Sequence, residues 1–158
     1  MNDLNRLIQR LYDADIEFVI VGGFAAMLHG SSLLTRDLDV CAVLTAENVQ
    51  KLRDAFRELR PVHRLTPQGL SFLDNPGPGV EVRNLYLRTD IGLLDVLTSI
   101  LGVGDYQRVY AQSAEIELFG RRCRVISIDD LIRAKEALGR EKDLLTVKEL
   151  RGIQEKTR

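Results

Sequence analysis

Hydrophobic residues recur at helical spacing in four segments of the chain. The pattern predicts amphipathic helices over residues 3–13, 45–60, 128–138 and 141–155. Each helix has one apolar side, so we expect the helices to flank a larger element. In the last helix, the residues expected to be buried are Leu144, Leu145, Val147, Leu150 and Ile153.

Apolar runs rich in β-branched residues predict the strands. The expected strands are Ile16–Val21, Asp37–Leu44, Val80–Leu87, Ile91–Leu97 and a hairpin of Glu115–Phe119 with Cys123–Ile128. The hairpin is expected to turn at residues 120–122. The predicted fold class is α/β, of the α+β kind, with a mixed β-sheet flanked by helices and the C-terminal helices packed on the core. Residues 61–80 are uninformative, although the Pro- and Gly-rich stretch 74–79 predicts a turn or a mobile loop that could form part of a lid.

Length and composition indicate one globular domain over residues 1–158. A chain of this length buries roughly 70% of the surface of its unfolded form, which is enough for a single core. Hydrophobic residues make up 45% of the sequence and charged residues 28%, which excludes a disordered or fibrous chain. The net charge of -1 argues against a protein that grips duplex DNA.

The cysteines and the absence of long apolar runs predict a cytoplasmic protein. Cys41 and Cys123 lie in apolar segments, where we expect small buried side chains in a reducing compartment. The sequence does not begin with a cationic and apolar leader, and no apolar run approaches the roughly 18 residues of a membrane span. We therefore expect no membrane partner.

Two carboxylates stand two residues apart at the start of the second predicted strand. Asp37 and Asp39 would point to the same side of that strand, while Leu38 points into the fold. At roughly 4 Å, two such charges repel by about 1 kcal/mol in water and about 4 kcal/mol at an effective dielectric near 20. A divalent metal would resolve this conflict. The Gly22–Gly23 turn and the short helix after it form a typical anion site, which suggests a nucleoside triphosphate. The alternative is a turn in which the two carboxylates accept backbone hydrogen bonds.

A third carboxylate, Asp95, interrupts an apolar run in which an unpaired charge would cost several kcal/mol. A metal shared with Asp37 and Asp39 would compensate that charge, but a buried arginine or a helix N-terminus would serve equally well. An ion pair of Asp95 with a basic group would argue against the enzyme hypothesis as a whole. Asp90 is the competing carboxylate, but its position after Thr89 predicts a turn, so we favour Asp95.

These segments together resemble the nucleotidyltransferase superfamily, whose DNA polymerase β-like core pairs a glycine turn with an Asp-x-Asp strand and a third acid on a neighbouring strand. The matching positions are Gly22, Gly23, Ala25, His29, Gly30, Thr35, Asp37, Asp39 and Asp95. Residues 129–143 resemble the closing helices of the small, stand-alone bacterial members, which include toxin-type nucleotidyltransferases. The resemblance covers most of the chain outside residues 61–80.

The resemblance implies a metal-dependent enzyme that moves a nucleoside monophosphate from an NTP to a hydroxyl acceptor, which could be tRNA or another RNA, a protein or a small molecule. The catalytic residues, which would bind Mg²⁺ or Mn²⁺, are Asp37, Asp39 and Asp95. The nucleotide-binding residues would be Gly22, Gly23, Thr35 and Lys135. Lys135 falls on the buried side of its helix, so it either neutralises a phosphate or extends its ammonium to solvent. Toxin-type members act with an antitoxin protein, so such a partner is implied.

Two positions depart from the family's pattern. Many members have Gly-Ser where this chain has Gly22–Gly23, so backbone N–H groups must replace a serine hydroxyl at the phosphate. An arginine often found four residues before the first aspartate is Leu33 here, which leaves one nucleotide contact without its usual residue.

Other polar residues have simpler explanations. His29 stands beside a glycine at a helix end, where histidine usually caps or packs. Arg121, Arg122 and Arg124 could contact RNA or a partner, although arginines at a hairpin tip are usually solvated. The sequence has neither a Walker A loop nor a Gly-x-Gly-x-x-Gly fingerprint, which argues against P-loop and dinucleotide-binding proteins.

Two other functions stay open. One is a non-catalytic nucleotide- or partner-binding module with the same fold, which would bind Mg-nucleotide without turnover. The other is a small-molecule nucleotidyltransferase that modifies an antibiotic, since some drug-modifying relatives also have a Gly-Gly turn before their Asp-x-Asp. Against this second function, 158 residues leave little chain for a dedicated drug pocket.

Overall fold

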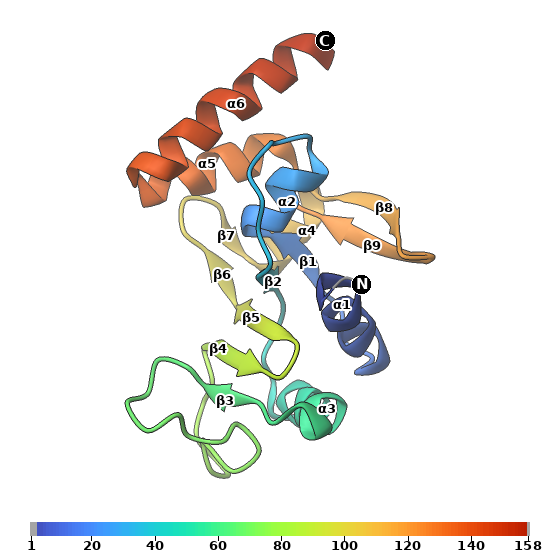
Figure 1. Ribbon diagram of the computed structural model, residues 1–158, viewed down its shortest axis with the longest axis vertical. Coiled ribbons are helices and arrows are strands. Elements are labelled where there is room, and N and C mark those ends of the chain that lie inside the picture. Colours follow the sequence, from blue (N-terminus) through green and yellow to red (C-terminus); the bar gives the residue numbers. More distant parts are fainter. Residues whose placement is uncertain (1–2, 158) are drawn as a thin grey trace.

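The computed structural model describes residues 3–157, whose strands form a seven-stranded mixed sheet and a separate two-stranded one (Figure 1). In spatial order the large sheet consists of β3 (Val62–His63), β4 (Asn84–Thr89), β5 (Gly92–Leu97), β2 (Leu38–Cys41), β1 (Val19–Val21), β9 (Arg121–Val125) and β8 (Ala114–Leu118). The small sheet pairs β6 (Ser99–Ile100) with β7 (Gly104–Asp105). Strand β2 runs parallel to β5 and antiparallel to β1, so the predicted mixed sheet is confirmed.

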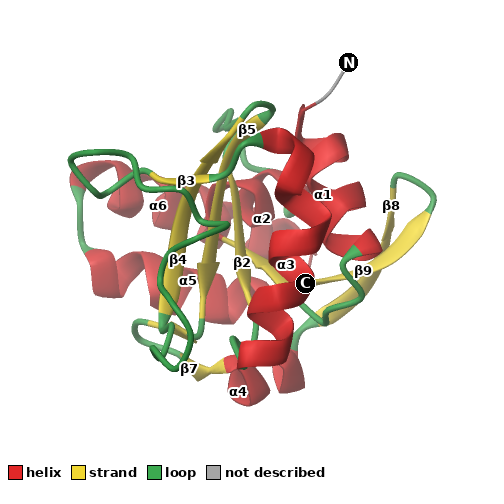
Figure 2. Cartoon of the chain, turned by 90° about the horizontal axis from the view of Figure 1, so that it is seen from below, coloured by secondary structure: helices red, strands yellow, loops and turns green. Residues whose placement is uncertain are grey.

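Helices lie on both sides of this sheet. They are α1 (Asp3–Asp13), α2 (Gly22–Leu28), α3 (Ala46–Phe56), α4 (Tyr106–Gln112), α5 (Ile128–Leu138) and α6 (Glu141–Thr157), and a 3₁₀ turn, Arg57–Leu59, extends α3. Figure 2 shows α1 and α3 on one side of the sheet and α5 and α6 on the other. Within the described part of the chain, no helix combines the length and apolar character needed to cross a membrane.

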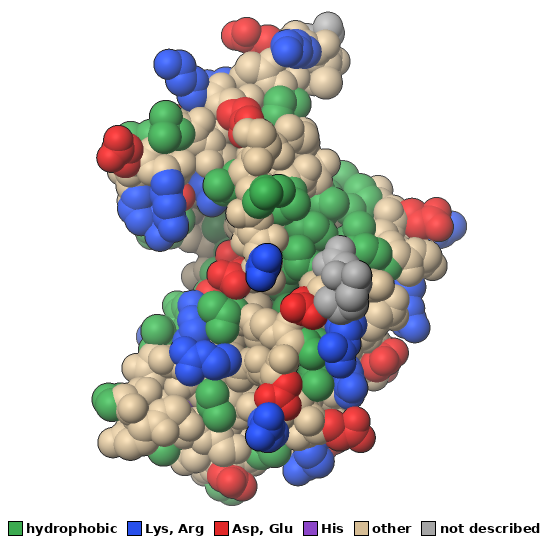
Figure 3. Space-filling view, in the orientation of Figure 1, with side chains coloured by type: hydrophobic (Ala, Val, Ile, Leu, Met, Phe, Trp, Pro, Cys, Tyr) green, Lys and Arg blue, Asp and Glu red, His purple; other side chains and the backbone are tan. Residues whose placement is uncertain are grey.

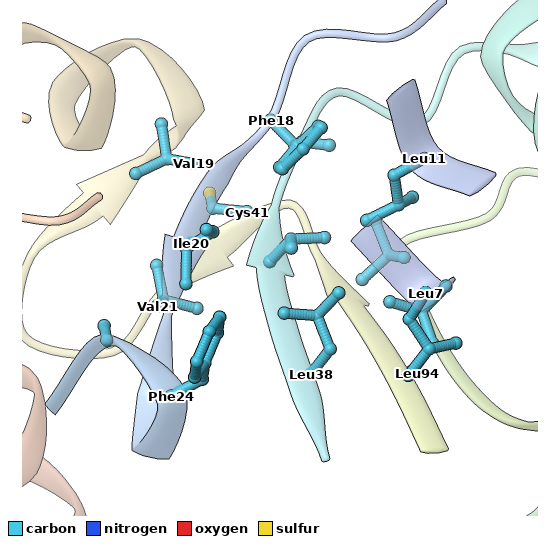
Figure 4. Packing of buried hydrophobic residues seen from close by; sticks show 14 of the residues in the cluster. Leu7, Leu11, Phe18, Val19, Ile20, Val21, Phe24, Leu38, Cys41 and Leu94 are labelled. Atoms are coloured by element: carbon cyan, nitrogen blue, oxygen red, sulfur yellow. The ribbon is translucent and has the colours of Figure 1, made fainter. Parts of the chain in front are cut away.

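The hydrophobic core lies mainly between the sheet and α1. Leu7 and Leu11 of α1 point toward Leu38 and Leu94 of the two central strands (Figure 4), and all four side chains are buried. Because successive side chains of a strand point to opposite faces, the residues after Leu38 and Leu94 face away from α1. The core therefore fixes which residues of β2 and β5 reach the other face.

Side-chain caps explain why the predicted helices begin where they do. The Thr45 hydroxyl accepts a hydrogen bond from the Asn48 N–H at the start of α3. The Ser127 hydroxyl accepts one from the Asp130 N–H at the start of α5, and Gly139, with φ of +66°, ends that helix. These helix boundaries agree with the sequence prediction.

Two predictions about local structure were wrong, and one helix was missed. The β8–β9 hairpin turns at Phe119–Gly120, because both residues adopt the positive φ that a two-residue turn requires, and β9 already begins at Arg121. In α6, Leu144 and Leu145 are exposed, because the buried face of the helix is set by other positions: Asp143, Thr146, Val147 and Leu150. Helix α4 was not predicted.

The segment from Arg64 to Arg83 connects β3 to β4 without a helix or a strand of its own. Arg53 of α3 holds it by donating hydrogen bonds to the carbonyl oxygens of Phe72 (2.8 Å) and Pro76 (2.8 Å). Phe72 is fully buried, so this segment is anchored at its middle. The predicted loop at residues 74–79 lies within it.

Candidate active site

Two acidic side chains lie next to each other on the sheet face opposite α1. Asp39 of β2 is directly paired with Asp95 of the parallel strand β5. Neighbouring strands are about 4.8 Å apart, and paired residues point to the same face. Asp37 precedes β2 and is exposed, so it stands at the edge of this pair rather than within the strand. The sheet thus gathers two of the three predicted catalytic carboxylates, and the third lies beside them.

Asp39 is pressed against the backbone of Gly22. A β-carbon built on Gly22 would lie 2.2 Å from Oδ2 of Asp39, closer than real atoms approach, and Gly22 has a φ of +70°. Gly22 and Gly23 form the first two residues of α2 rather than a loop before it. The first glycine is therefore required both by the backbone conformation and by the carboxylate that lies on it.

The site disfavours the charged form of Asp39. Burial, then the nearby carboxylates of Asp95 and Asp37, raise the pKa of Asp39 to about 6, and Lys135 and Arg64 only partly offset this effect. The three carboxylates therefore repel one another through space even though they come from separate parts of the chain. A cation placed among them would remove that repulsion.

Asp95 already has a positive partner. The Arg64 guanidinium donates hydrogen bonds to both oxygens of Asp95, from Nη1 to Oδ1 and from Nη2 to Oδ2 (3.0 Å for the second). The pKa of Asp95 is nevertheless raised, because burial outweighs the contribution of Arg64. The arginine pair that the sequence left open as an alternative to a metal is thus present. Among residues 3–157, no group of three or more His, Cys, Asp or Glu side chains lies close enough to hold a metal ion.

The donor chemistry of the site nevertheless fits Mg²⁺ or Mn²⁺. Both cations prefer carboxylate oxygens, and Asp37 and Asp39 offer them at the edge of the sheet. The absent side chain of Gly22 leaves room for the Asp39 carboxylate against the main chain. Asp95 can chelate the cation with both oxygens only if Arg64 releases them.

Thr35 supports this arrangement from the loop before β2. Its Oγ1 accepts a hydrogen bond from the backbone N–H of Asp37 (3.2 Å). Its side chain also lies against Gly23, since a β-carbon built there would be 3.4 Å from Thr35. Thr35 therefore connects the loop that carries Asp37 to the start of α2.

A cavity of about 120 Å³ opens beside Asp39, and two cations line it. Its walls include Gly22 and Asp39 from the sheet side, and Lys135 and Arg140 from the C-terminal helices. Hydrophobic side chains from α5, from the ends of β1, β5 and β6, and from the residue after β9 form the rest of the wall. Positive charge thus faces Asp39 across the cavity.

Asp143 of α6 holds both cations. It is fully buried, accepts hydrogen bonds from Arg140 Nε (2.6 Å) and Nη2 (3.2 Å), and lies 3.6 Å from Nζ of Lys135. The Arg140 hydrogen bonds, together with the charge of Lys135, lower the pKa of Asp143 despite its burial. Lys135 is itself buried, and its ammonium pairs with Asp143 at the wall of the cavity.

The outer surface is hollowed at this level of the molecule. Figure 3 shows a recess between the part that carries α5 and α6 and the part that carries β3 and β4, with acidic side chains near it and basic side chains on both sides. A larger cavity of about 390 Å³ lies between α3 and residues 76–82, away from the carboxylates. We take the recess with the charged groups as the site because it contains groups that can bind a triphosphate.

The remaining predicted candidates lie outside the site. His29 ends α2, and its Nε2 is 2.7 Å from the carbonyl oxygen of Ile126. Asp90 lies in the β4–β5 turn and pairs with Arg60. The three arginines of β9 form ion pairs away from the carboxylates: Arg121 pairs with Asp13 of α1, and Arg122 and Arg124 pair with Glu115 of β8.

Sequence reasoning missed Arg64 and Arg140. Arg64 lies in the segment without a periodic pattern, so no local signal pointed to it. Arg140 had a weak signal, because Asp143 follows three residues later, a spacing at which helical side chains meet.

The comparisons with known proteins agree on the architecture. No protein-family model matches the chain, and no curated protein matches it by sequence. Among solved structures, a lincosamide antibiotic adenylyltransferase, LnuA, with lincomycin bound, superposes with a TM-score of 0.63 at 16% identity over 96% of each chain. A candidate nucleotidyltransferase from Thermotoga maritima has a TM-score of 0.56 at 16% identity over 94% of each chain. An antigenic nucleotidyltransferase-like protein from Paracoccidioides brasiliensis has a TM-score of 0.54 at 18% identity, over 94% of this chain and 72% of that one.

One neighbour is an adenylyltransferase and the other two are named as a nucleotidyltransferase and a nucleotidyltransferase-like protein, and each superposes on at least 94% of this chain. In this chain Asp39 and Asp95 lie on neighbouring strands beside the glycines that begin α2. The chain therefore has the fold of the nucleotidyltransferase superfamily.

Proposed function

We propose that this protein transfers a nucleoside monophosphate from an NTP to a hydroxyl acceptor, with Mg²⁺ or Mn²⁺ as the cofactor. One observation carries the proposal: Asp39 lies against Gly22, is paired with Asp95, and faces a cavity lined by Lys135 and Arg140. Carboxylates on one side and cations on the other suit a metal-bound triphosphate.

The residues divide the work as follows. Asp37 and Asp39 would hold the cation, with Asp95 as a further ligand. When bound, the cation supplies neutralising charge at the triphosphate and at the attacking oxygen. The N–H groups of Gly22 and Gly23 would donate hydrogen bonds to phosphate oxygens.

Lys135 and Arg140 would bind the phosphates from the opposite wall of the cavity. Because Asp143 fixes both side chains, little conformational entropy is lost when they bind. Asp95, whose pKa is raised by burial, would accept the proton of the acceptor hydroxyl once Arg64 releases it. Thr35 would contact the nucleotide from the loop before β2.

A small molecule is the acceptor class that the structural neighbours favour. The lincosamide adenylyltransferase is matched over 96% of its own chain, so a protein of similar length holds lincomycin. The argument that 158 residues leave too little chain for a drug pocket therefore loses its force. RNA and protein acceptors, a toxin-type role and an antitoxin partner stay predictions that rest on the sequence resemblance.

The second candidate function is a non-catalytic nucleotide-binding module. The ion pair between Arg64 and Asp95 favours it, because Asp95 is neutralised without a metal. Such a module would bind Mg-nucleotide and release it unchanged.

Labelled nucleotides distinguish the two functions. The protein is incubated with each of four α-³²P-labelled NTPs, with Mg²⁺ or Mn²⁺, and with lincomycin, bulk tRNA or no added acceptor. We expect label on one acceptor, complete loss of labelling in Asp39→Asn, and unchanged labelling in Asp90→Asn, whose carboxylate pairs with Arg60 outside the site. Labelling that persists in Asp39→Asn would place the chemistry elsewhere, and nucleotide binding without any labelling would favour the binding module.

A further inference from the structure

The guanidinium of Arg64 is held on two sides. One side forms the two hydrogen bonds to the Asp95 carboxylate, and the other lies over the ring of Tyr86, 5.3 Å from the ring centroid. The backbone N–H of Arg64 also donates to the carbonyl oxygen of Tyr86 (3.0 Å). Tyr86 and Asp95 are directly paired on β4 and β5, so Arg64 spans two adjacent side chains of the same row.

The hydrogen bonds from Arg64 occupy the Asp95 oxygens that a chelating cation would bind. An arginine that bonds both oxygens of a carboxylate occupies the two lone pairs that face each other, which are the ones that a chelating cation would use. The two side chains are also shielded, with exposed fractions of 21% for Arg64 and 18% for Asp95. A divalent cation that chelates both oxygens therefore competes with Arg64 for the same lone pairs.

Within residues 3–157, Asp39 forms no such ion pair. Of the two paired carboxylates, Asp95 is the one that an arginine neutralises, whereas Asp39 lies against Gly22 and faces Lys135 only through the cavity. Without Arg64, two adjacent half-buried carboxylates would repel each other across the strands. The arginine thus substitutes for a cation at one of the two positions.

We propose that Arg64 is a built-in counter-ion that competes with the divalent cation for Asp95. This inference rests on the proposed function, because it takes Asp95 as a ligand of the metal. Cation binding then requires Arg64 to give up the Asp95 carboxylate while it keeps its place over Tyr86. Arg64 consequently lowers the affinity of the site for free metal and leaves Asp95 neutralised when the site holds none.

A double-mutant cycle with Mn²⁺ alone tests the competition. Free Mn²⁺ is measured by electron paramagnetic resonance during titration of the wild type, Arg64→Ala, Asp95→Asn and the double variant. We expect Arg64→Ala to lower the Kd for Mn²⁺ roughly tenfold, as the loss of a charged hydrogen-bonded competitor implies. In the Asp95→Asn background the same substitution should change the Kd far less, since Arg64 no longer has a carboxylate to hold.

Two further variants separate competition from general charge effects and from misfolding. Arg88→Ala removes an exposed arginine two residues along β4 from Tyr86, on the same face, and should leave the Kd unchanged. Arg64→Lys keeps the charge but loses the two-pronged contact, so we expect a Kd between those of the wild type and Arg64→Ala. Arg64→Lys provides the decisive comparison if Arg64→Ala fails to fold.

The outcomes also distinguish this inference from the proposed function. An unchanged or weaker affinity for Mn²⁺ in both Arg64 variants, or an equal gain in affinity with and without Asp95, would overturn the competition. The enzyme proposal would stay intact in that case if Asp39→Asn, titrated in the same way, loses Mn²⁺ binding. Absence of Mn²⁺ binding in every variant would overturn both.

Discussion

Gly22 and Asp39 are in such close contact that the glycine has no room for a side chain: a β-carbon on Gly22 would lie 2.2 Å from Oδ2 of Asp39. This contact joins the start of α2 to the strand that carries the carboxylate. The identity of residue 22 therefore controls where the carboxylate of Asp39 can lie.

Gly22→Ala should both destabilise the protein and displace the carboxylate. Gly120→Ala is the matched control, because Gly120 also has a positive φ, +80°, but no atom lies within 4 Å of its added β-carbon. We expect Gly120→Ala to cost about 1 kcal/mol of backbone strain and to keep activity. Gly22→Ala should cost more and abolish nucleotide labelling, as urea unfolding and the transfer assay would measure. If the two variants lose the same free energy of unfolding, the protein accommodates a β-carbon on residue 22 beside Asp39 at no extra cost, which would contradict the prediction.

Asp39→Asn should raise stability at neutral pH even though it abolishes activity. The pKa of Asp39 is about 6 in the folded protein against 3.8 ordinarily, so the folded state binds more protons between these values. The free energy of unfolding contributed by Asp39 therefore falls as the pH rises from about 4 to 6 and stays low above it. We expect metal-free Asp39→Asn to be more stable than the wild type at pH 7.5, by on the order of 1 kcal/mol, and to lose this advantage near pH 4. Thermal unfolding at both pH values measures the effect, and a destabilised variant at pH 7.5 would contradict it.

Asp143→Asn should weaken nucleotide binding as well as stability. Asp130→Asn is its control, because Asp130 is equally buried and pairs with two arginines, Arg108 and Arg133, but does not hold the cations of the cavity. Each substitution should lower the free energy of unfolding by about 3 kcal/mol. Only Asp143→Asn should raise the Kd for Mg-NTP, by roughly tenfold, because Lys135 and Arg140 lose their anchor. Isothermal titration calorimetry measures the Kd. An equal change of the Kd in both variants would mean that Asp143 affects nucleotide binding only by stabilising the fold.

Thr35→Val should slow nucleotidyl transfer, whereas Thr35→Ser should not. The hydroxyl of Thr35 accepts a hydrogen bond from the backbone N–H of Asp37. Valine removes that acceptor but keeps the shape of the side chain. We expect the turnover rate of the valine variant to fall several-fold and its folding stability to fall by about 1 kcal/mol. Steady-state kinetics measure the turnover rate, with the acceptor that the labelling experiment identifies. A valine variant with wild-type turnover would show that the Thr35 hydroxyl does not position Asp37.

The sequence predicted those parts of the fold whose causes are local. Thr45 and Ser127 cap helices through groups three residues away, so their patterns could be recognised without tertiary contacts. Asp105 caps α4 in the same way, by accepting from the N–H of Arg108, but the seven-residue helix is too short to show a period. The placement of Asp95 on a strand next to the one that carries Asp39 was expected from the family resemblance and not from a local pattern.

The parts that sequence reasoning missed depend on contacts between distant segments. The buried face of α6 is set by Asp143, which is stable in the interior only because Lys135 and Arg140 pair with it. The spacing of the hydrophobic residues alone led to the wrong prediction that Leu144 and Leu145 are buried. Arg64 reaches Asp95 across 31 positions of the chain, and no nearby pattern marks an arginine that will meet a carboxylate on another strand.

The anchoring of Lys135 and Arg140 by Asp143 has a consequence for synthesis. A growing chain that ends before α6 already has the sheet, the glycines and every carboxylate of the recess, but not the residue that aims its two cations. Such a nascent chain would have the carboxylates of the site without its fixed cations, so we expect the proposed nucleotide chemistry to begin only after α6 has left the ribosome and docked.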